Sequence, residues 1–195
     1  MYKTGAFKRF GLSNYLTADV EKVHSICNAK GYVLPTVYQG NYSAVARLQE
    51  TKLFPTLRKL NMAFYAYSPL AGGFLTKTAQ QIQDGAGRFN METAGGVYRQ
   101  MFMKPSYLEA LAKWEAIAKD EGVSRAELAY RWVASNSPLD RAHGDAIIIG
   151  ASSIEQLKQT LEGIEKGKLS DKAVQAIDAI WDTIKHEAPL DSFNK

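Results

Sequence analysis

Cysteine, histidine and long apolar runs are scarce in this sequence. Its one cysteine, Cys27, excludes a disulfide within the chain and is typical of a reducing compartment, so we expect a cytoplasmic protein. The three histidines are widely separated and predict no metal site. No apolar run approaches the roughly 18 residues of a membrane span, and the first residues lack a signal-peptide core, so we expect no membrane association.

Blocks of like charge are also missing. The net charge is +4 and the sequence pI is about 9.0, but the lysines and arginines are scattered along the chain. No nucleic-acid recognition motif accompanies them, so we expect no nucleic-acid partner. A mild basic excess instead favours a small anionic ligand, such as a phosphorylated compound.

The sequence does contain a repeated alternation of strand-like and helix-like segments. Strands are predicted at 7–12, 36–39, 62–67 and 145–149. Helices are predicted from a cap at Thr17, over 48–60 with a break at Pro55, over 107–119, and from caps at Ser124, Ser153 and Ser170. The last strand is an unbroken apolar run, which is typical of a strand buried on both faces. Residues 71–104 have weak periodicity and predict a long loop.

Four strands, each followed by a helix, predict an α/β fold with a parallel sheet. The Gly-x-Gly-x-x-Gly turn of an open dinucleotide-binding fold is absent. A complete eight-stranded TIM barrel typically needs around 250 residues, and the chain has 195. We therefore predict a partial, half TIM barrel and a single domain over residues 1–195. Its open edge strands favour a homodimer that closes the barrel.

Function in a barrel resides where strands end and loops begin, and four such ends carry polar residues. They are Gly11-Leu12-Ser13-Asn14, Tyr38-Gln39-Gly40-Asn41-Tyr42, Tyr67-Ser68-Pro69-Leu70-Ala71-Gly72-Gly73 and Ile149-Gly150-Ala151-Ser152-Ser153. Taken singly, the first three are also explained by turn chemistry or packing. The fourth opens a capped helix, whose exposed backbone N–H groups form a ready anion site.

In this order, the four strand ends resemble those of the aldo-keto reductase family, in particular its aflatoxin-aldehyde reductase branch. The segments 7–15, 34–42 and 144–150 extend the likeness. The resemblance covers nearly the whole chain, but only the C-terminal half of the family's barrel. It implies an NADP(H)-linked carbonyl or aldehyde oxidoreductase. The implied substrate is a small carbonyl or polyketide-like compound of secondary metabolism.

The resemblance also implies the residues that hold NADP(H). They are Ser13, Asn14 and Gln39 at the nicotinamide carboxamide, Tyr67 stacked on its ring, Ser68, Leu70 and Gly72 along the pyrophosphate, Gly150, Ser152 and Gln156 at the 2′-phosphate, and Gln159 at the adenine. Arg88, in the predicted loop, would either clamp the cofactor phosphates when the loop closes or lie exposed on the surface. Two places depart from the family pattern. Thr160 stands where Asn is common, and residues 192–195 lack the aromatic-Arg pair that helps bind acidic substrates.

The family's catalytic Asp, Tyr, Lys and His belong to the half of the barrel that this chain does not match. The catalytic residues are therefore unknown, and the candidates within the chain are Tyr42, Tyr67 and His186. Three functions remain open. The chain is a reductase, a non-redox biosynthetic enzyme such as an isomerase, cyclase or dehydratase, or a non-catalytic cofactor-binding or interaction module.

Overall fold

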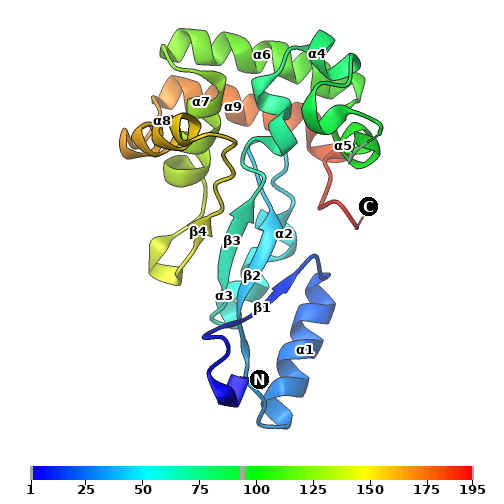
Figure 1. The fold of residues 1–195 in the computed structure, drawn as a ribbon, viewed down its shortest axis with the longest axis vertical. Coiled ribbons are helices and arrows are strands. Elements are labelled where there is room, and N and C mark those ends of the chain that lie inside the picture. The colour runs from blue at the N-terminus through cyan, green and yellow to red at the C-terminus, as the bar shows by residue number, and fades with distance from the viewer. Residues whose placement is uncertain (1, 93–94, 195) are drawn as a thin grey trace.

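The computed structural model describes residues 2–92 and 95–194, and its centre is a parallel four-stranded sheet (Figure 1). The strands are β1 (Phe10–Ser13), β2 (Pro35–Asn41), β3 (Ala63–Tyr67) and β4 (Ala146–Ile147), in the order β1-β2-β3-β4. Within the described chain no strand lies outside β1 or β4, so the sheet is not closed. This confirms the predicted α/β fold of four parallel strands alternating with helices, consistent with a partial TIM barrel.

Helices connect the strands. The α-helices are α1 (Thr17–Ala29), α2 (Gln49–Lys52), α3 (Phe54–Lys59), α4 (Ala79–Gln83), α5 (Gly95–Phe102), α6 (Pro105–Glu121), α7 (Arg125–Arg131), α8 (Ile154–Glu165) and α9 (Asp171–Ile184). Shorter 3-10 or π turns lie at Tyr2–Thr4, Ala71–Thr76, Gly87–Phe89, Trp132–Asn136, Arg141–His143 and Lys185–Glu187. The break predicted at Pro55 is confirmed, since α2 ends at Lys52 and α3 places Pro55 in its first turn.

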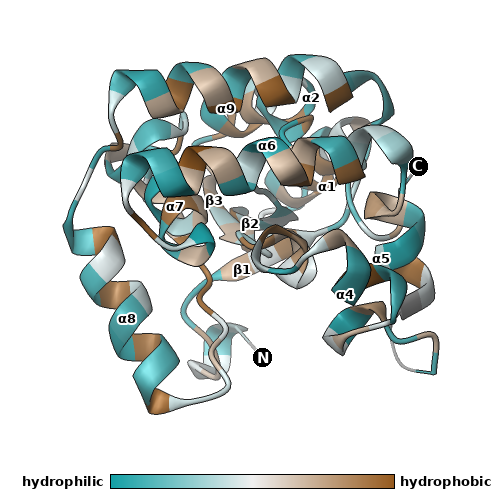
Figure 2. Ribbon diagram, turned by 90° about the horizontal axis from the view of Figure 1, so that it is seen from above, coloured by the Kyte–Doolittle hydropathy of each residue, from teal (hydrophilic) through white to brown (hydrophobic). Residues whose placement is uncertain are grey.

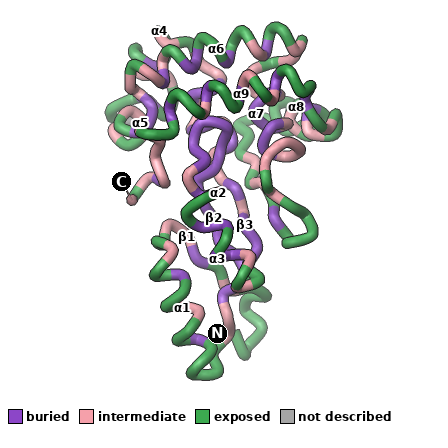
Figure 3. Tube along the Cα trace, turned by 180° about the vertical axis from the view of Figure 1, so that it is seen from behind, coloured by how far each residue is buried: buried purple, intermediate pink, exposed green. Residues whose placement is uncertain are grey.

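The helices α4 to α9 gather beyond one end of the sheet, whereas α1 lies beside β1 and β2 (Figure 1). Helices α6 and α9 lie side by side, as the view from above also shows (Figure 2). The burial map shows the central strands and the turn that follows them as buried, with α1 largely exposed (Figure 3). None of the helices described is long and apolar enough to cross a membrane.

An aromatic cluster forms the centre of the hydrophobic core. The ring of Tyr42 lies 5.6 Å from Phe54, 5.9 Å from Phe64 and 5.9 Å from Trp132, measured between ring centroids. Tyr42, Phe64 and Trp132 are each at most 2% exposed. Buried aromatic rings at these separations contribute large apolar areas. The cluster therefore joins the turn after β2 to β3 and to the helices of the C-terminal half.

The prediction of a long loop over residues 71–104 was wrong. The segment folds into short helices, and it buries Phe74, Phe89 and Phe102, of which Phe74 stacks on Phe102 at 5.5 Å. A Thr78–Gln81 capping box begins α4. The buried aromatics are too far apart in sequence to produce a helical period, which is why the pattern suggested a loop.

Two local predictions also need correction. Leu16, not Thr17, is the N-cap of α1, and the hydroxyl of Thr17 donates to the carbonyl of Lys52 at 2.5 Å. The strand expected at 145–149 shortens to Ala146–Ile147, and Ile148 is 36% exposed. Burial on both faces requires a neighbouring strand and a covering layer, and the outer side of β4 has no strand among the described residues.

Helix α8 likewise lies at the periphery. Its apolar side chains Ile154, Leu157 and Leu161 are 77%, 40% and 46% exposed. Figure 2 shows hydrophobic positions along this outlying helix. The apolar stripe that predicts the helix therefore has no core to face within the described chain.

Candidate functional site

A cleft of about 760 Å³ opens beside the ends of β2 and β3. Its walls include Gln39, Tyr67, Ser68, Leu70, Gly72, Arg88, Gly150, Ser152 and Gln156, all of them expected cofactor residues. An adjoining hollow of about 330 Å³ adds Ser13 and Asn14, and shares Gln39 and Tyr67 with the cleft. A second adjoining hollow of about 740 Å³ adds Gln159, and shares Leu70, Gly150 and Gln156. The three hollows share lining residues and together contain the whole expected set, and we call them the trough.

Hydrogen bonds order the first end of this trough. Ser13 lies opposite Gln39 in the β1–β2 register. The hydroxyl of Tyr67 donates to Oδ1 of Asn14 at 2.9 Å, and Nδ2 of Asn14 donates to Oγ of Ser13 at 3.0 Å. Burial, and next the negative charge of Asp191, raises the pKa of Tyr67 to about 12. Tyr67 therefore remains a neutral hydrogen-bond donor at neutral pH.

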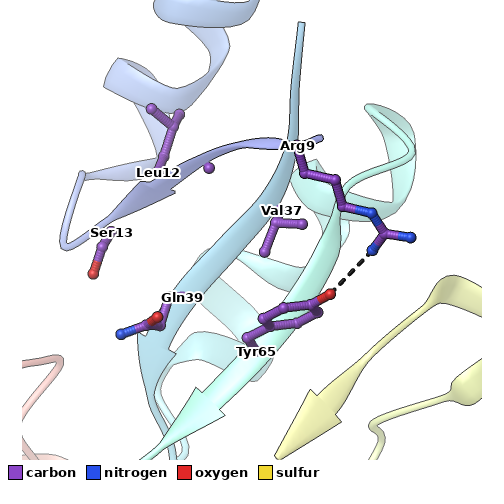
Figure 4. A pocket seen from close by; sticks show the side chains of 7 residues that line it. Arg9, Leu12, Ser13, Val37, Gln39 and Tyr65 are labelled. Atoms are coloured by element: carbon purple, nitrogen blue, oxygen red, sulfur yellow. Dashed lines mark hydrogen bonds between the residues drawn. The ribbon is translucent and has the colours of Figure 1, made fainter. Parts of the chain in front are cut away.

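Beside this end, one face of the sheet carries both polar and apolar side chains. Arg9, Ser13, Val37, Gln39 and Tyr65 line a hollow of about 360 Å³ there, together with Gly11 and Leu12 (Figure 4). Arg9 donates through Nη1 to the hydroxyl of Tyr65 at 3.0 Å. Gln39 is exposed, so its amide remains accessible from the hollow and from the cleft.

Strained backbone concentrates in the turn that follows β3. Ser68 and Ala71 have φ values of 57° and 51°, and Gly72 and Gly73 have 68° and 93°. Left-handed backbone is unfavourable for residues that carry a Cβ, and such residues persist mainly at functional sites. A Cβ at Gly72 would also lie 2.1 Å from the ring of Tyr98. The turn therefore needs glycine at position 72 to let α5 approach the cleft.

The other end of the trough is suited to an anion. Ser153 caps α8 by accepting from the backbone N–H of Gln156 at 3.2 Å. Oε1 of Gln156 in turn accepts from the backbone N–H and hydroxyl of Ser152, at 3.0 and 2.8 Å. The N-terminus of this helix therefore meets the cleft with its polar groups already ordered. A helix N-terminus favours negative charge through its free N–H groups and its dipole.

Two cations line the same cleft. Arg88 donates through Nη1 to the hydroxyl of Tyr98 at 2.8 Å. Lys77, which the sequence analysis did not single out, donates to the carbonyl of Gly73 at 3.4 Å. Burial lowers the pKa of Lys77 below its ordinary value of 10.5. A partly buried ammonium group with few partners is suited to bind an anion, and only the position of Lys77 after the glycine pair hints at this in the sequence.

Of the three candidate catalytic residues, the structure brings only Tyr67 into the trough. Tyr42 is 0% exposed, and its hydroxyl donates to Oε1 of Glu50 at 2.6 Å. Burial raises the pKa of Tyr42 well above its usual value. His186 is exposed on the short turn Lys185–Glu187. No group of three His, Cys, Asp or Glu side chains within the described residues is arranged to hold a metal ion.

The donor set fits NADP(H). One end offers the neutral amides and hydroxyls that a carboxamide requires, and the cleft that adjoins it offers two cations and a helix N-terminus for phosphate groups. Tyr67, between the two ends, offers an aromatic ring. A parallel half barrel with an anion site beyond its last strand is the class of protein that the fold and the trough define.

Comparison with known proteins agrees with that class. Residues 1–182 match the model of the aldo/keto reductase family, so the chain belongs to this family. Over 97% of its length it is 40% identical to oxidoreductase sirO of Leptosphaeria maculans and 42% identical to aflatoxin B1 aldehyde reductase member 2 of Homo sapiens. It covers 58% and 55% of those relatives. Aldo-keto reductase pigE of Monascus ruber is 29% identical over 95% of the chain, which covers 56% of that relative. The chain thus spans little more than half the length of these relatives.

Proposed function

We propose that this chain binds NADP(H) along the trough and serves in the NADP(H)-linked reduction of a small carbonyl compound. The observation that carries the proposal is the gathering of the expected cofactor residues, from Ser13 to Gln159, in three hollows that share lining residues. The names of the relatives, which include an oxidoreductase and aldehyde reductases, support the reaction class. When bound, the cofactor supplies a hydride.

In this proposal, different residues of the chain bind different parts of the cofactor. Ser13, Asn14 and Gln39 offer hydrogen bonds to a carboxamide, and Tyr67 offers its ring to the nicotinamide face. Lys77 and Arg88 offset the phosphate charges from the loop side of the cleft, and Gln156 and Ser152 offer hydrogen bonds at the N-terminus of α8. Because Ser13, Gln39 and Tyr67 come from separate strands, a bound cofactor would connect the carboxyl ends of β1, β2 and β3.

The proposed substrate is a neutral, partly aromatic carbonyl compound, which includes polyketide-like compounds. The hollow beside the nicotinamide end is lined by Val97, Tyr98 and Phe193 in addition to the cofactor residues. None of its described lining residues is charged. Asp191 lies close enough to raise the pKa of Tyr67. Its negative charge disfavours a carboxylate-bearing substrate in this hollow.

Calorimetric titration of the chain with NADPH and with NADH tests the proposal. We expect NADPH to bind at least about tenfold more tightly, because only NADPH carries the 2′-phosphate, and the loss of its contacts with Ser152, Gln156 and the N-terminus of α8 exceeds about 1.4 kcal/mol. Replacing Lys77 and Arg88 together by Ala should weaken the binding of both nucleotides, because both carry the pyrophosphate. Lys172→Ala, an 82% exposed cation on α9, should leave both affinities unchanged. Failure of the wild-type chain to bind either nucleotide would overturn the proposal.

We also propose that residues 1–195 fold as one domain and that two copies associate through the open edges. The unpaired outer sides of β1 and β4 and the exposed apolar residues of α8 support this. Light scattering during size-exclusion chromatography should give twice the mass of the chain. The double variant Leu157→Lys, Leu161→Lys should give a monomer whose melting temperature no longer depends on protein concentration. A wild-type monomer at all concentrations would refute the association.

A further inference from the structure

The C-terminal tail closes on the nicotinamide end of the trough. Nδ2 of Asn194 donates to the backbone carbonyl of Asn14 at 3.0 Å, across 180 positions of sequence. The same nitrogen donates to Oδ2 of Asp191 at 2.8 Å. Both N–H groups of the Asn194 amide therefore donate, one to Asp191 within the tail and one to Asn14 in the turn after β1.

Asp191 organises the tail so that this amide points at Asn14. Its Oδ1 accepts from the backbone N–H groups of Phe193 and Asn194, each at 2.7 Å. Asp191 is only 4% exposed. The side-chain amide of Gln49 also donates to the carbonyl of Leu190 at 3.3 Å, which ties the start of the tail to α2. A buried carboxylate with three hydrogen bonds holds its partners in one arrangement.

The turn that receives the amide is unusual and fixed from several sides. Asn14 has a φ of 59°, a left-handed conformation that a residue with a side chain adopts at a cost. Its side chain accepts from Tyr67, and the next carbonyl, that of Tyr15, accepts from the hydroxyl of Tyr38 at 2.8 Å. Asn194 adds a hydrogen bond to the carbonyl of Asn14 itself.

We infer that Asn194 and Asp191 are positioning residues for the nicotinamide end of the cofactor site. Asn194 holds Asn14 in its left-handed conformation, so that the side chain of Asn14 lies between Ser13 and Tyr67, and Asp191 orients Asn194. The inference rests on the proposed binding of NADP(H). Its effect is confined to one end of the trough, because Gly150, Ser152 and Gln156 make no contact with the tail among the described hydrogen bonds.

Two ligands separate this role from general stabilisation. NADPH spans the whole trough, whereas 2′,5′-ADP carries only the adenosine and its phosphates. Loss of one hydrogen bond to an ordered group is worth about 0.5–1.5 kcal/mol. Asn194→Ala should therefore weaken NADPH binding about three- to tenfold and leave the affinity for 2′,5′-ADP within about twofold. Asp191→Asn, which sets two amide groups against each other, should act in the same direction.

The experiment is a calorimetric titration of the full chain with both ligands, with melting curves of each variant and Lys172→Ala as the surface control. Equal weakening of both ligands would show that the tail stabilises the fold in general, and would overturn the inference. An unchanged affinity for NADPH in both variants would also overturn it. If the wild-type chain binds neither ligand, the proposed function fails and the inference fails with it. Binding of 2′,5′-ADP by the wild type with no additional affinity for NADPH would contradict the inference alone.

Discussion

The carboxylate of Asp145 accepts from both terminal nitrogens of Arg58, at 3.0 and 2.5 Å. The same carboxylate accepts from the backbone N–H of Phe64 at 2.7 Å and from that of Asp140 at 2.9 Å. Its side chain is 1% exposed. The buried carboxylate of Asp145, at the start of the short and otherwise exposed strand β4, thus connects this strand to α3 and β3.

Removal of this acid should destabilise the chain strongly. Asp145→Ala leaves Arg58 and two backbone N–H groups without their acceptor, and breaking a buried ion pair typically costs about 3–5 kcal/mol. The free energy of unfolding, measured with urea, should fall by that amount. Asp120→Ala is the control, because its pair with Lys172 is 63% and 82% exposed and such pairs contribute about 0–1 kcal/mol. Equal losses in the two variants would contradict the prediction.

The affinity for NADPH should fall as the pH rises into the alkaline range. Burial lowers the pKa of Lys77 below 10.5, so its ammonium group loses its proton earlier than a free lysine does. Binding of a phosphate favours the protonated form, so affinity is greatest below the lowered pKa and is lost as the pH rises through it. Lys77→Arg keeps its charge and should bind with an affinity that hardly changes from pH 7 to 10. The same decline in the arginine variant would assign the pH dependence to another group.

Substitution of Gly72 tests the packing of the turn against α5. Gly72 and Gly122 have nearly equal φ values of 68° and 70°, but a Cβ at Gly122 would meet no atom within 4 Å. Gly122→Ala should therefore cost only the left-handed strain, about 1–2 kcal/mol. Gly72→Ala should cost a further 1–3 kcal/mol or so, because Tyr98 must move away. It should also weaken NADPH binding, since Tyr98 partners Arg88. Equal melting temperatures for the two variants would show that Tyr98 yields without strain.

The resemblance to the family, not a local sequence signal, implied the expected cofactor residues, and they lie near one another because parallel strands bring their carboxyl ends to one edge of a sheet. The placement of three strands put Ser13, Gln39 and Tyr67 at polar strand ends, and only the resemblance implied a role for them. Lys77 and Asn194 were missed for a different reason. Lys77 reaches the cleft only because residues 71–104 fold into packed short helices, and Asn194 because the tail returns across the whole chain to Asn14.

The opposite error concerns burial. The apolar residues of 145–149 and of α8 correctly predicted a strand and a helix, but they also predicted a burial that the structure does not show. Periodicity indicates which face of an element is apolar, and not whether other residues cover that face. Ile148, Leu157 and Leu161 remain exposed beside the open edge of the sheet. Information about what covers such a face lies in tertiary or quaternary contacts, which a local pattern does not encode.

Glu50 provides a prediction about stability and pH. Burial raises its pKa above the ordinary 4.5, although the hydrogen bond from Tyr42 and the charge of Arg47 act in the opposite direction. The folded chain therefore holds this proton at pH values where the unfolded chain has lost it. The stabilising contribution is fully present below the unfolded pKa and is lost as the pH rises through the raised folded value.

Glu50→Gln removes this titration and keeps an oxygen that can accept from Tyr42. The variant should melt at a higher temperature than the wild type at pH 7, and the difference should shrink as the pH falls toward 4. Thermal melts at intervals between pH 4 and pH 7 measure it, with Glu109→Gln on the exposed face of α6 as the matched control. Parallel curves for Glu50→Gln and the wild type would mean that the buried carboxylate is ionised without penalty. In that case, the positive charge of Arg47 would stabilise the ionised form of Glu50 enough to offset the cost of its burial.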